Sequence, residues 1–241
     1  NVRRRRWFRK CKITTSGPWI EFGQTTFRSI SLFCNEINSK ETCICAWAVS
    51  SNGEALCRIG VTSCSPKGHS WQHIACEQPL VDISVGGSQQ SDCYQVWAIA
   101  SDGSAFLRHN VSQNMMPSGS VWFHVEPPKK SCALVRISVG QTSVWAVDEK
   151  NRLWFRAEIV PTFPEGTHWK KICDNVLMVS SNCQDELFAI LIKESSDNTT
   201  NILAKRVGIS ETNKIGTHWE YVSDQLTYFQ FVSSSIGCVQ T

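Results

Sequence analysis

The chain has 241 residues, of which 41% are hydrophobic, so it is long and apolar enough to bury a sizeable core. No run approaches the ~18 uninterrupted apolar residues that a membrane-spanning helix needs, so we expect no such helix. The net charge is +3, but residues 1–12 alone carry +7, so the other 229 residues carry −4. This mildly acidic body does not favour nucleic-acid binding. Because the sequence starts without an initiator Met or an apolar signal segment, we expect a piece of a longer protein.

The basic head of the chain, NVRRRRWFRK, has aromatic residues among its arginines. A basic run of this kind indicates an anionic partner, an anionic lipid surface or a solvated strand. Trp7 and Phe8 favour an ordered strand over a disordered tail. The candidate contacts for an anionic partner or lipid are Arg3, Arg4, Arg5, Arg6 and Trp7.

A unit that recurs about every 50 residues dominates the rest of the sequence. Its first fixed point is a Trp followed 11 residues later by an Arg, as in VWAVDEKNRLWFR from Val144 to Arg156. Its second is a Gly-containing segment that ends in Trp, such as PEGTHW, and an Ile-Ser-Val segment precedes the first. The Trp–Arg pairs are Trp47 and Arg58, Trp97 and Arg108, and Trp145 and Arg156; the second tryptophans are Trp71, Trp122, Trp169 and Trp219, with Trp19 as an earlier relative.

The fourth copy departs from the pattern. Phe188 takes the place of the first Trp, and Arg206 follows it after 18 residues instead of 11. The seven extra residues are polar and lie between two apolar segments, so we expect a surface loop there.

Each unit reads as four short strands. Asn52-Gly53 and Asp102-Gly103 separate apolar segments and favour tight hairpin turns. A four-stranded unit of this size cannot bury both faces alone, but units packed face to face around an axis can, which predicts an all-β fold, a β-propeller of four-stranded antiparallel blades. The predicted repeats are residues 29–74, 81–125, 135–172 and 177–222, with a partial one at 226–241.

The repeated residues favour structural roles. Large aromatic residues supply most of the buried area in such blades, so the repeated Trp residues are expected in the core. The repeated Arg residues either cap a strand edge or span adjacent blades, or else they bind a ligand; their presence in every unit favours the structural role.

The segment VWAVDEKNRLWFRAEIVPTFPEGTHWKKI resembles the tectonin repeat, and the other copies resemble it over residues 13–225. The head, VRRRRWFRKC, is similar to the end of a dysferlin-like (DysF) domain, which assigns residues 1–12 to that region and residues 13–241 to the propeller. The combination resembles a family of cytosolic autophagy and damaged-lysosome factors. It implies a non-enzymatic protein-interaction scaffold in the cytoplasm, peripherally associated with autophagosome and lysosome membranes.

The resemblance also implies partners. They are the autophagy 5–12 conjugate and, through regions outside this chain, membrane phosphoinositide or sphingomyelin; no nucleic acid is expected. A peroxisome-related role remains an alternative.

A carbohydrate-binding lectin of innate immunity is the other alternative, because related propellers include lectins and ten Trp residues could supply sugar platforms. A secreted lectin would favour paired cysteines. The 12 Cys residues are scattered relative to the repeat, which favours reduced thiols and a reducing compartment.

The sequence offers no catalytic motif, and we expect no enzyme, metal or cofactor. There is no CxxC, HExxH or GxSxG pattern. Asp102, Asp148 and Glu149 fall in or beside turns, where solvated acidic residues are ordinary.

The two ends of the chain each hold an incomplete repeat. RRRRWFRKCKI and SGPWIEF match the third and fourth strands of a unit, and the tail after Gln225 matches the first two. We therefore expect residues 226–240 to pair with residues 3–22 in a fifth blade, which would remove exposed sheet edges.

Overall fold

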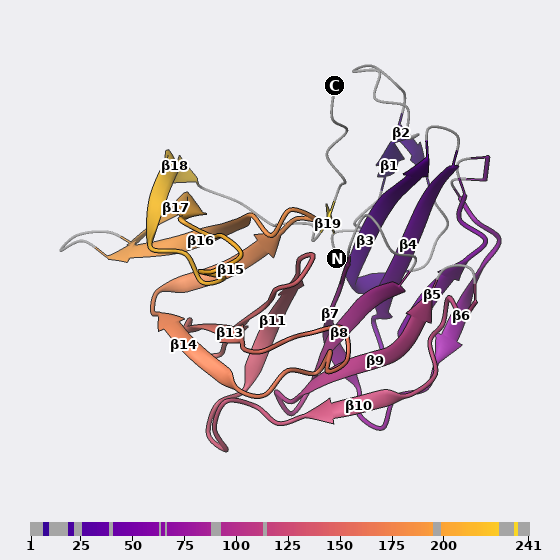
Figure 1. Ribbon diagram of the computed structural model, residues 1–241, viewed down its shortest axis with the longest axis horizontal. Coiled ribbons are helices and arrows are strands. Elements are labelled where there is room, and N and C mark those ends of the chain that lie inside the picture. The colour runs from indigo at the N-terminus through magenta and orange to yellow at the C-terminus, as the bar shows by residue number, and fades with distance from the viewer. Residues whose placement is uncertain are drawn as a thin grey trace.

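The computed structural model describes residues 7–9, 19–21, 26–38, 41–62, 64–65, 67–87, 93–112, 115–194, 199–226 and 234–235. Over these residues the regular structure consists of strands, most of them in three four-stranded antiparallel sheets and one sheet in which a fifth, short strand joins four antiparallel ones. The predicted all-β propeller architecture of four-stranded antiparallel blades is confirmed. The sheets follow one another around an arc, with their first strands towards its middle and their fourth strands at the periphery (Figure 1).

Each sheet, called a blade here, is formed by four strands that follow one another along the chain. Blade one comprises β3 (Phe27–Asn38), β4 (Glu41–Ser50), β5 (Ala55–Ile59) and β6 (Ser70–Ile74). Blade two comprises β7 (Leu80–Gly87), β8 (Cys93–Ala100), β9 (Ala105–Ser112) and β10 (Trp122–Val125). Blade three comprises β11 (Leu134–Val139), β12 (Val144–Asp148), β13 (Leu153–Arg156) and β14 (Trp169–Cys173). Blade four comprises β15 (Val176–Ser181), β16 (Leu187–Glu194), β17 (Thr199–Val207) and β18 (His218–Leu226).

In blades one and two, the turn between the second and third strands holds the start of the next blade. The carbonyl oxygen of Gly53 accepts from the backbone N–H of Leu80 at 2.8 Å, and that of Gly103 accepts from Leu134 at 3.0 Å. Both glycines have positive φ, and a Cβ on Gly103 would lie 2.4 Å from the Cα of Ala133. These turns therefore require glycine both for their backbone conformation and for the close approach of the next blade.

Buried serines link the innermost strands. The hydroxyl oxygen of Ser31 accepts from the backbone N–H of Val85 at 2.9 Å, and that of Ser84 accepts from Val139 at 3.0 Å. Ser138 accepts from the N–H of Ser181 at 2.7 Å in the same way. Each hydroxyl satisfies a buried backbone donor of the following blade, so the Ser of the Ile-Ser-Val segment contributes to blade order.

Tryptophan pairs fill the space between blades. Trp47 of β4 packs edge-to-face on Trp122 of β10 with ring centroids 6.1 Å apart, and Trp97 of β8 packs on Trp169 of β14 at 6.3 Å. In the third interface Trp145 and Trp219 belong to one apolar cluster. The second strand of one blade thus shares a core with the fourth strand of the next.

The ends of the chain contribute three short strands. β1 (Trp7–Arg9) pairs with β2 (Trp19–Glu21), and Arg9 stands opposite Trp19. β19 (Ser234–Ser235) runs parallel to β3 beside Leu32 and Phe33. The expected pairing of residues 226–240 with residues 3–22 falls largely outside the described residues and stays a prediction, as does the assignment of residues 1–12 to a dysferlin-like region.

A partly buried carboxylate lies where three blades meet. Asp82 of β7 accepts from the hydroxyl of Ser29 at 2.6 Å in blade one and from the backbone N–H of Ile137 at 2.9 Å in blade three. Burial raises the pKa of Asp82 above its ordinary value, although these hydrogen bonds and the charge of Arg136 act in the opposite direction.

This raised pKa gives a pH dependence that D82N should remove. Stability linked to the protonated carboxyl is present below the unfolded pKa of ~4 and is lost as the pH rises through the higher folded value. The free energy of unfolding of D82N, minus that of the wild type, should therefore become more positive between about pH 4 and pH 7. Urea titrations of both proteins measure this difference, and a constant or falling difference would show that the pKa is not raised.

Truncation of an inter-blade tryptophan should be costly. Trp169 is buried against Trp97, and W169A should lower the free energy of unfolding by ~3–5 kcal/mol. Denaturant unfolding measures the loss, with Y221S as the control because Tyr221 is 59% exposed. A loss below ~1 kcal/mol for W169A would place Trp169 outside the core.

Candidate protein-interaction site

The repeated arginines stand opposite the repeated tryptophans on neighbouring strands. Each Arg lies on the third strand of its blade, and each Trp lies on the fourth. The guanidinium carbon lies 5.1–5.4 Å from the centroid of the Trp ring in all four blades. The pairs are Arg58 and Trp71, Arg108 and Trp122, Arg156 and Trp169, and Arg206 and Trp219.

Each arginine also holds the loop between its third and fourth strands. Nε of Arg156 donates to the carbonyl of Glu165 at 2.7 Å, and Nη2 donates to the carbonyl of Gly166 at 3.1 Å. Gly166 has a φ of 60°, and the loop glycines of the other blades lie between 61° and 65°. The equivalent Nε donations run from Arg58 to Lys67, from Arg108 to Ser118 and from Arg206 to Ile215, at 2.8–2.9 Å. We call this arrangement the arginine clamp.

Burial sets the electrostatics of the clamp. It lowers the pKa of Arg156 to about 10, and it shifts the pKa of the other three clamp arginines in the same direction. The Nε–H of each clamp guanidinium donates to a loop carbonyl, and the guanidinium carbon lies over a tryptophan ring. The clamp therefore orders the loop, which is a structural role for the repeated arginines.

The clamped loops share a backbone shape but differ at their tips. In blade three the backbone groups of Val160 and Phe163 exchange hydrogen bonds of 3.3 and 2.9 Å. The same exchange joins Thr62 to Ser65, Ser112 to Met116, and Ser210 to Asn213. Loops that share backbone hydrogen bonds but present different side chains are suited to the selective recognition of a partner.

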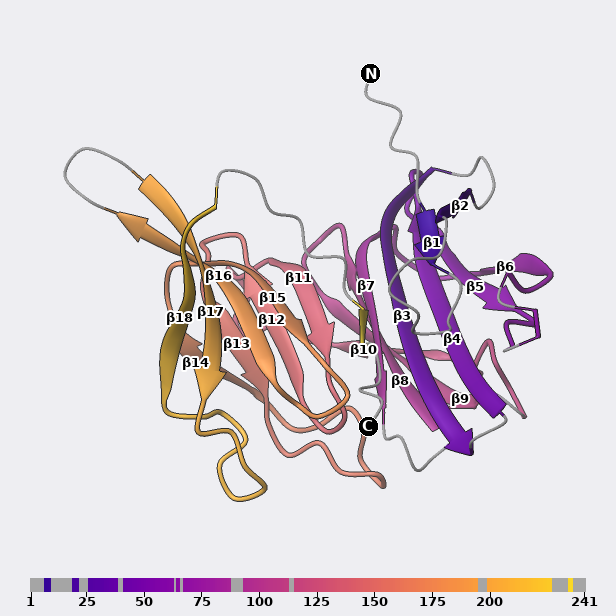
Figure 2. The same ribbon diagram turned by 90° about the horizontal axis from the view of Figure 1, so that it is seen from above.

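The tips of the blade-two and blade-three loops are apolar and exposed. Met115 is 85% exposed and Met116 42% in the blade-two loop, and Val160 and Phe163 are 46% and 41% exposed in the blade-three loop. The loops of blades three and four extend from the same side of the molecule (Figure 2). Exposed apolar side chains on the loops of two successive blades indicate an interaction surface, so these loops form the candidate site.

The other residues singled out in the sequence lie elsewhere. Trp47, Trp97 and Trp145 are fully buried, so their ring faces are closed to a ligand such as a sugar. Trp7 and Trp19 belong to β1 and β2, and Arg3, Arg4, Arg5 and Arg6 fall outside the described residues.

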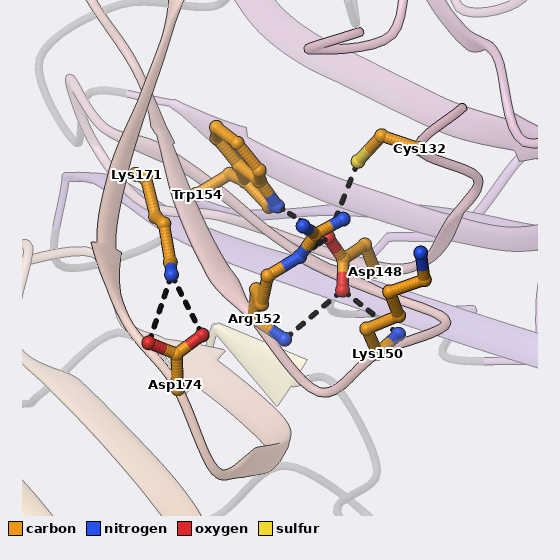
Figure 3. Close-up of polar contacts among 7 residues, drawn as sticks. All are labelled: Cys132, Asp148, Lys150, Arg152, Trp154, Lys171 and Asp174. Carbon is orange, nitrogen blue, oxygen red and sulfur yellow. Dashed lines mark hydrogen bonds and ion pairs between the residues drawn. The ribbon is translucent and has the colours of Figure 1, made fainter. Parts of the chain in front are cut away.

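Asp148 is not the solvated turn residue that its sequence position suggested. It is fully buried and accepts from Nε of Arg152 at 2.6 Å, from Nε1 of Trp154 at 2.8 Å and from the thiol of Cys132 at 3.2 Å (Figure 3). Two backbone N–H groups, of Lys150 and Arg152, also donate to it. The Asp148 carboxylate therefore stabilises the turn that follows it. The spacing of residues in the sequence does not predict this role.

The pKa values of this cluster agree with a structural role. Burial acts to raise the pKa of Asp148, but the hydrogen bonds from Trp154 and Arg152 outweigh it, so the pKa lies below the ordinary value. Burial and the neighbouring carboxylate raise the pKa of Cys132 to about 11. The thiol stays protonated as a donor, so it is not a nucleophile at neutral pH.

Across the described ranges, no group of three or more His, Cys, Asp or Glu side chains could hold a metal ion. No helix in that part of the chain is long and apolar enough to cross a membrane. Cys45, Cys57, Cys64, Cys76, Cys132 and Cys173 are unbridged thiols.

The clamp predicts a graded response to Arg→Lys substitution. Lysine cannot reproduce the two-pronged donation of Arg156, so R156K should lower the free energy of unfolding by ~1–3 kcal/mol. R58K should cost less, because the side chain of Arg58 is more exposed than the buried side chain of Arg156. Equal losses for the two variants in denaturant titrations would contradict this account of the clamp.

Comparison with known proteins places these features in a family. A family profile described as "Tectonin domain" matches residues 76–239, and one described as "Propeller" matches residues 46–74. The tectonin beta-propeller repeat-containing protein of Drosophila melanogaster is 36% identical over 228 residues, which cover 90% of this chain and 16% of that protein. Tectonin beta-propeller repeat-containing protein 1 of Homo sapiens is 39% identical over 224 residues, covering 91% of this chain and 19% of that protein.

The chain therefore spans less than a fifth of the length of these relatives. Among solved structures it is similar to YCF48 from Cyanidioschyzon merolae, at 14% identity and a TM-score of 0.46 over 92% of this chain and 60% of that one.

Proposed function

The chain belongs to the tectonin family of β-propeller repeat proteins, and on that premise we propose that it is a non-enzymatic protein-interaction scaffold. It forms part of a factor that tethers autophagosomes to lysosomes and acts in autophagosome maturation, fusion or the response to damaged lysosomes. The factor works in the cytoplasm, peripherally on the membranes of both organelles.

The observation that carries this proposal is the clamped loop. The backbone of each loop is fixed by the arginine and the loop glycine, so ordering it on binding costs little entropy. The tips can therefore differ without disturbing the blades. Met115, Met116 and Phe163 supply exposed apolar area of the kind that protein partners bury.

The partner that we propose for these tips is the autophagy 5–12 conjugate. Phosphoinositide or sphingomyelin is bound by regions of the whole protein outside this chain, so the propeller itself needs no lipid site. The lectin alternative has less support, because the buried tryptophan faces of blades one to three leave no sugar platform at those positions.

Binding of the purified chain to the purified 5–12 conjugate, measured by biolayer interferometry, tests the proposal. The triple variant M115S/M116S/F163S should weaken binding by at least about tenfold, equivalent to ~1.4 kcal/mol, because it removes the apolar tips. Y221S/V222S is the matched control, since Tyr221 and Val222 are as exposed but lie on β18. No binding by the wild type, or equal binding by both variants, would refute the assignment.

A further inference from the structure

The outer strand of blade two differs from its three counterparts. Val121 and Phe123 are 58% and 44% exposed. The strand register places Phe123 opposite Leu107, and the same position in the other blades is taken by a polar residue. The equivalent pairs are Ser70 and Gln72 in blade one, His168 and Lys170 in blade three, and His218 and Glu220 in blade four, all exposed.

β10 is also an open edge. It is the last strand of its sheet and pairs with β9 alone over the described residues. Proteins usually protect such edges with charged side chains, as β14 does with Lys170 and Lys171. β10 reads Trp-Phe-His-Val and has no Lys, Arg, Asp or Glu. Its exposed backbone groups and apolar side chains are those that an added strand would use.

The surroundings of β10 are basic, although the chain beyond its first twelve residues is acidic. Residues 105–136 contain four cations and one anion, Glu126. One of the cations is the clamp arginine Arg108, and the exposed Lys129 and Lys130 follow β10. The corresponding residues 153–178 of blade three contain three of each. The excess of positive charge is therefore found near the apolar edge of blade two and is absent from the corresponding part of blade three.

The dimensions fit a short extended segment. A strand of about six to eight residues, at ~3.3 Å per residue, covers β10 and continues towards the lysines that follow it. Its alternate side chains would face the apolar positions, and acidic side chains would meet Lys129 and Lys130.

We propose that β10 binds an extended acidic peptide segment of a partner protein, which adds to blade two as a fifth strand. Backbone hydrogen bonds along the edge supply part of the affinity. Val121 and Phe123 select apolar residues at alternate positions of the peptide, and the lysines select acidic residues. This site lies outside the loop tips and does not depend on their function.

The test uses a panel of fluorescein-labelled peptides of about eight residues, with Val, Ile, Leu or Phe alternating with Glu or Asp. A second panel has Lys in place of the acidic residues. In anisotropy titrations of the whole chain, acidic members should bind at least about tenfold more tightly than their Lys counterparts, and added salt should reduce the difference. N-methylation of alternate peptide nitrogens should abolish binding, because it removes the donors that pair with the edge.

The variant V121S/F123Q has the residues that blade one has at these positions. It should keep the melting temperature of the wild type but no longer bind the peptides. K129Q/K130Q should retain apolar binding but lose the preference for acidic members. K170Q/K171Q, on the edge of blade three, is the matched control and should bind as the wild type does.

Three results would overturn the proposal: no acidic preference in the wild type, unchanged binding by V121S/F123Q, or full binding of the N-methylated peptides. Binding to phosphatidylserine vesicles that V121S/F123Q loses, without peptide binding, would also overturn it and identify a lipid surface instead.

Discussion

The fold depends on a contact that no single blade can make. A four-stranded sheet has two apolar faces, and in this chain the tryptophan of a second strand is buried by the tryptophan of the next blade's fourth strand, as Trp97 is by Trp169. The guanidinium of the clamp arginine Arg156 lies over the ring of Trp169. Trp169 therefore connects the core between the blades to the loop on the surface. Loss of packing between blades should therefore reach the loops that we propose as the interaction site.

The repeat made the architecture predictable, because turn glycines, apolar runs and evenly spaced tryptophans act through local geometry that every copy shares. The serines at the blade interface were visible as part of the Ile-Ser-Val segment, but their role was not. Ser84 satisfies a backbone donor 55 residues away, and only the placement of blade three brings that donor to it. The expectation that Asp148 is solvated is wrong for the same reason. Its burial depends on Trp154 and Cys132, whose side chains donate hydrogen bonds to it in the folded blade.

We propose that function in this chain lies where the repeat varies. The clamp arginines recur in all four blades and are used for loop order, whereas the loop tips and the edge of blade two differ between copies. Phe123 has Gln72, Lys170 and Glu220 as its counterparts, so comparison among blades separates residues that build the repeat from residues that distinguish one blade. The sequence contains this information, but the register of strands is needed to align it.

A double-mutant cycle between Trp97 and Trp169 tests whether adjacent blades complete each other's core. The free energies of unfolding of W97A, W169A, the double variant and the wild type give the coupling energy between the two rings. We expect a coupling of ~0.5–1.5 kcal/mol for this pair, and additivity within ~0.5 kcal/mol for Trp47 and Trp169, which belong to different inter-blade pairs. Additive losses for Trp97 and Trp169 would contradict the claim that adjacent blades complete each other's core.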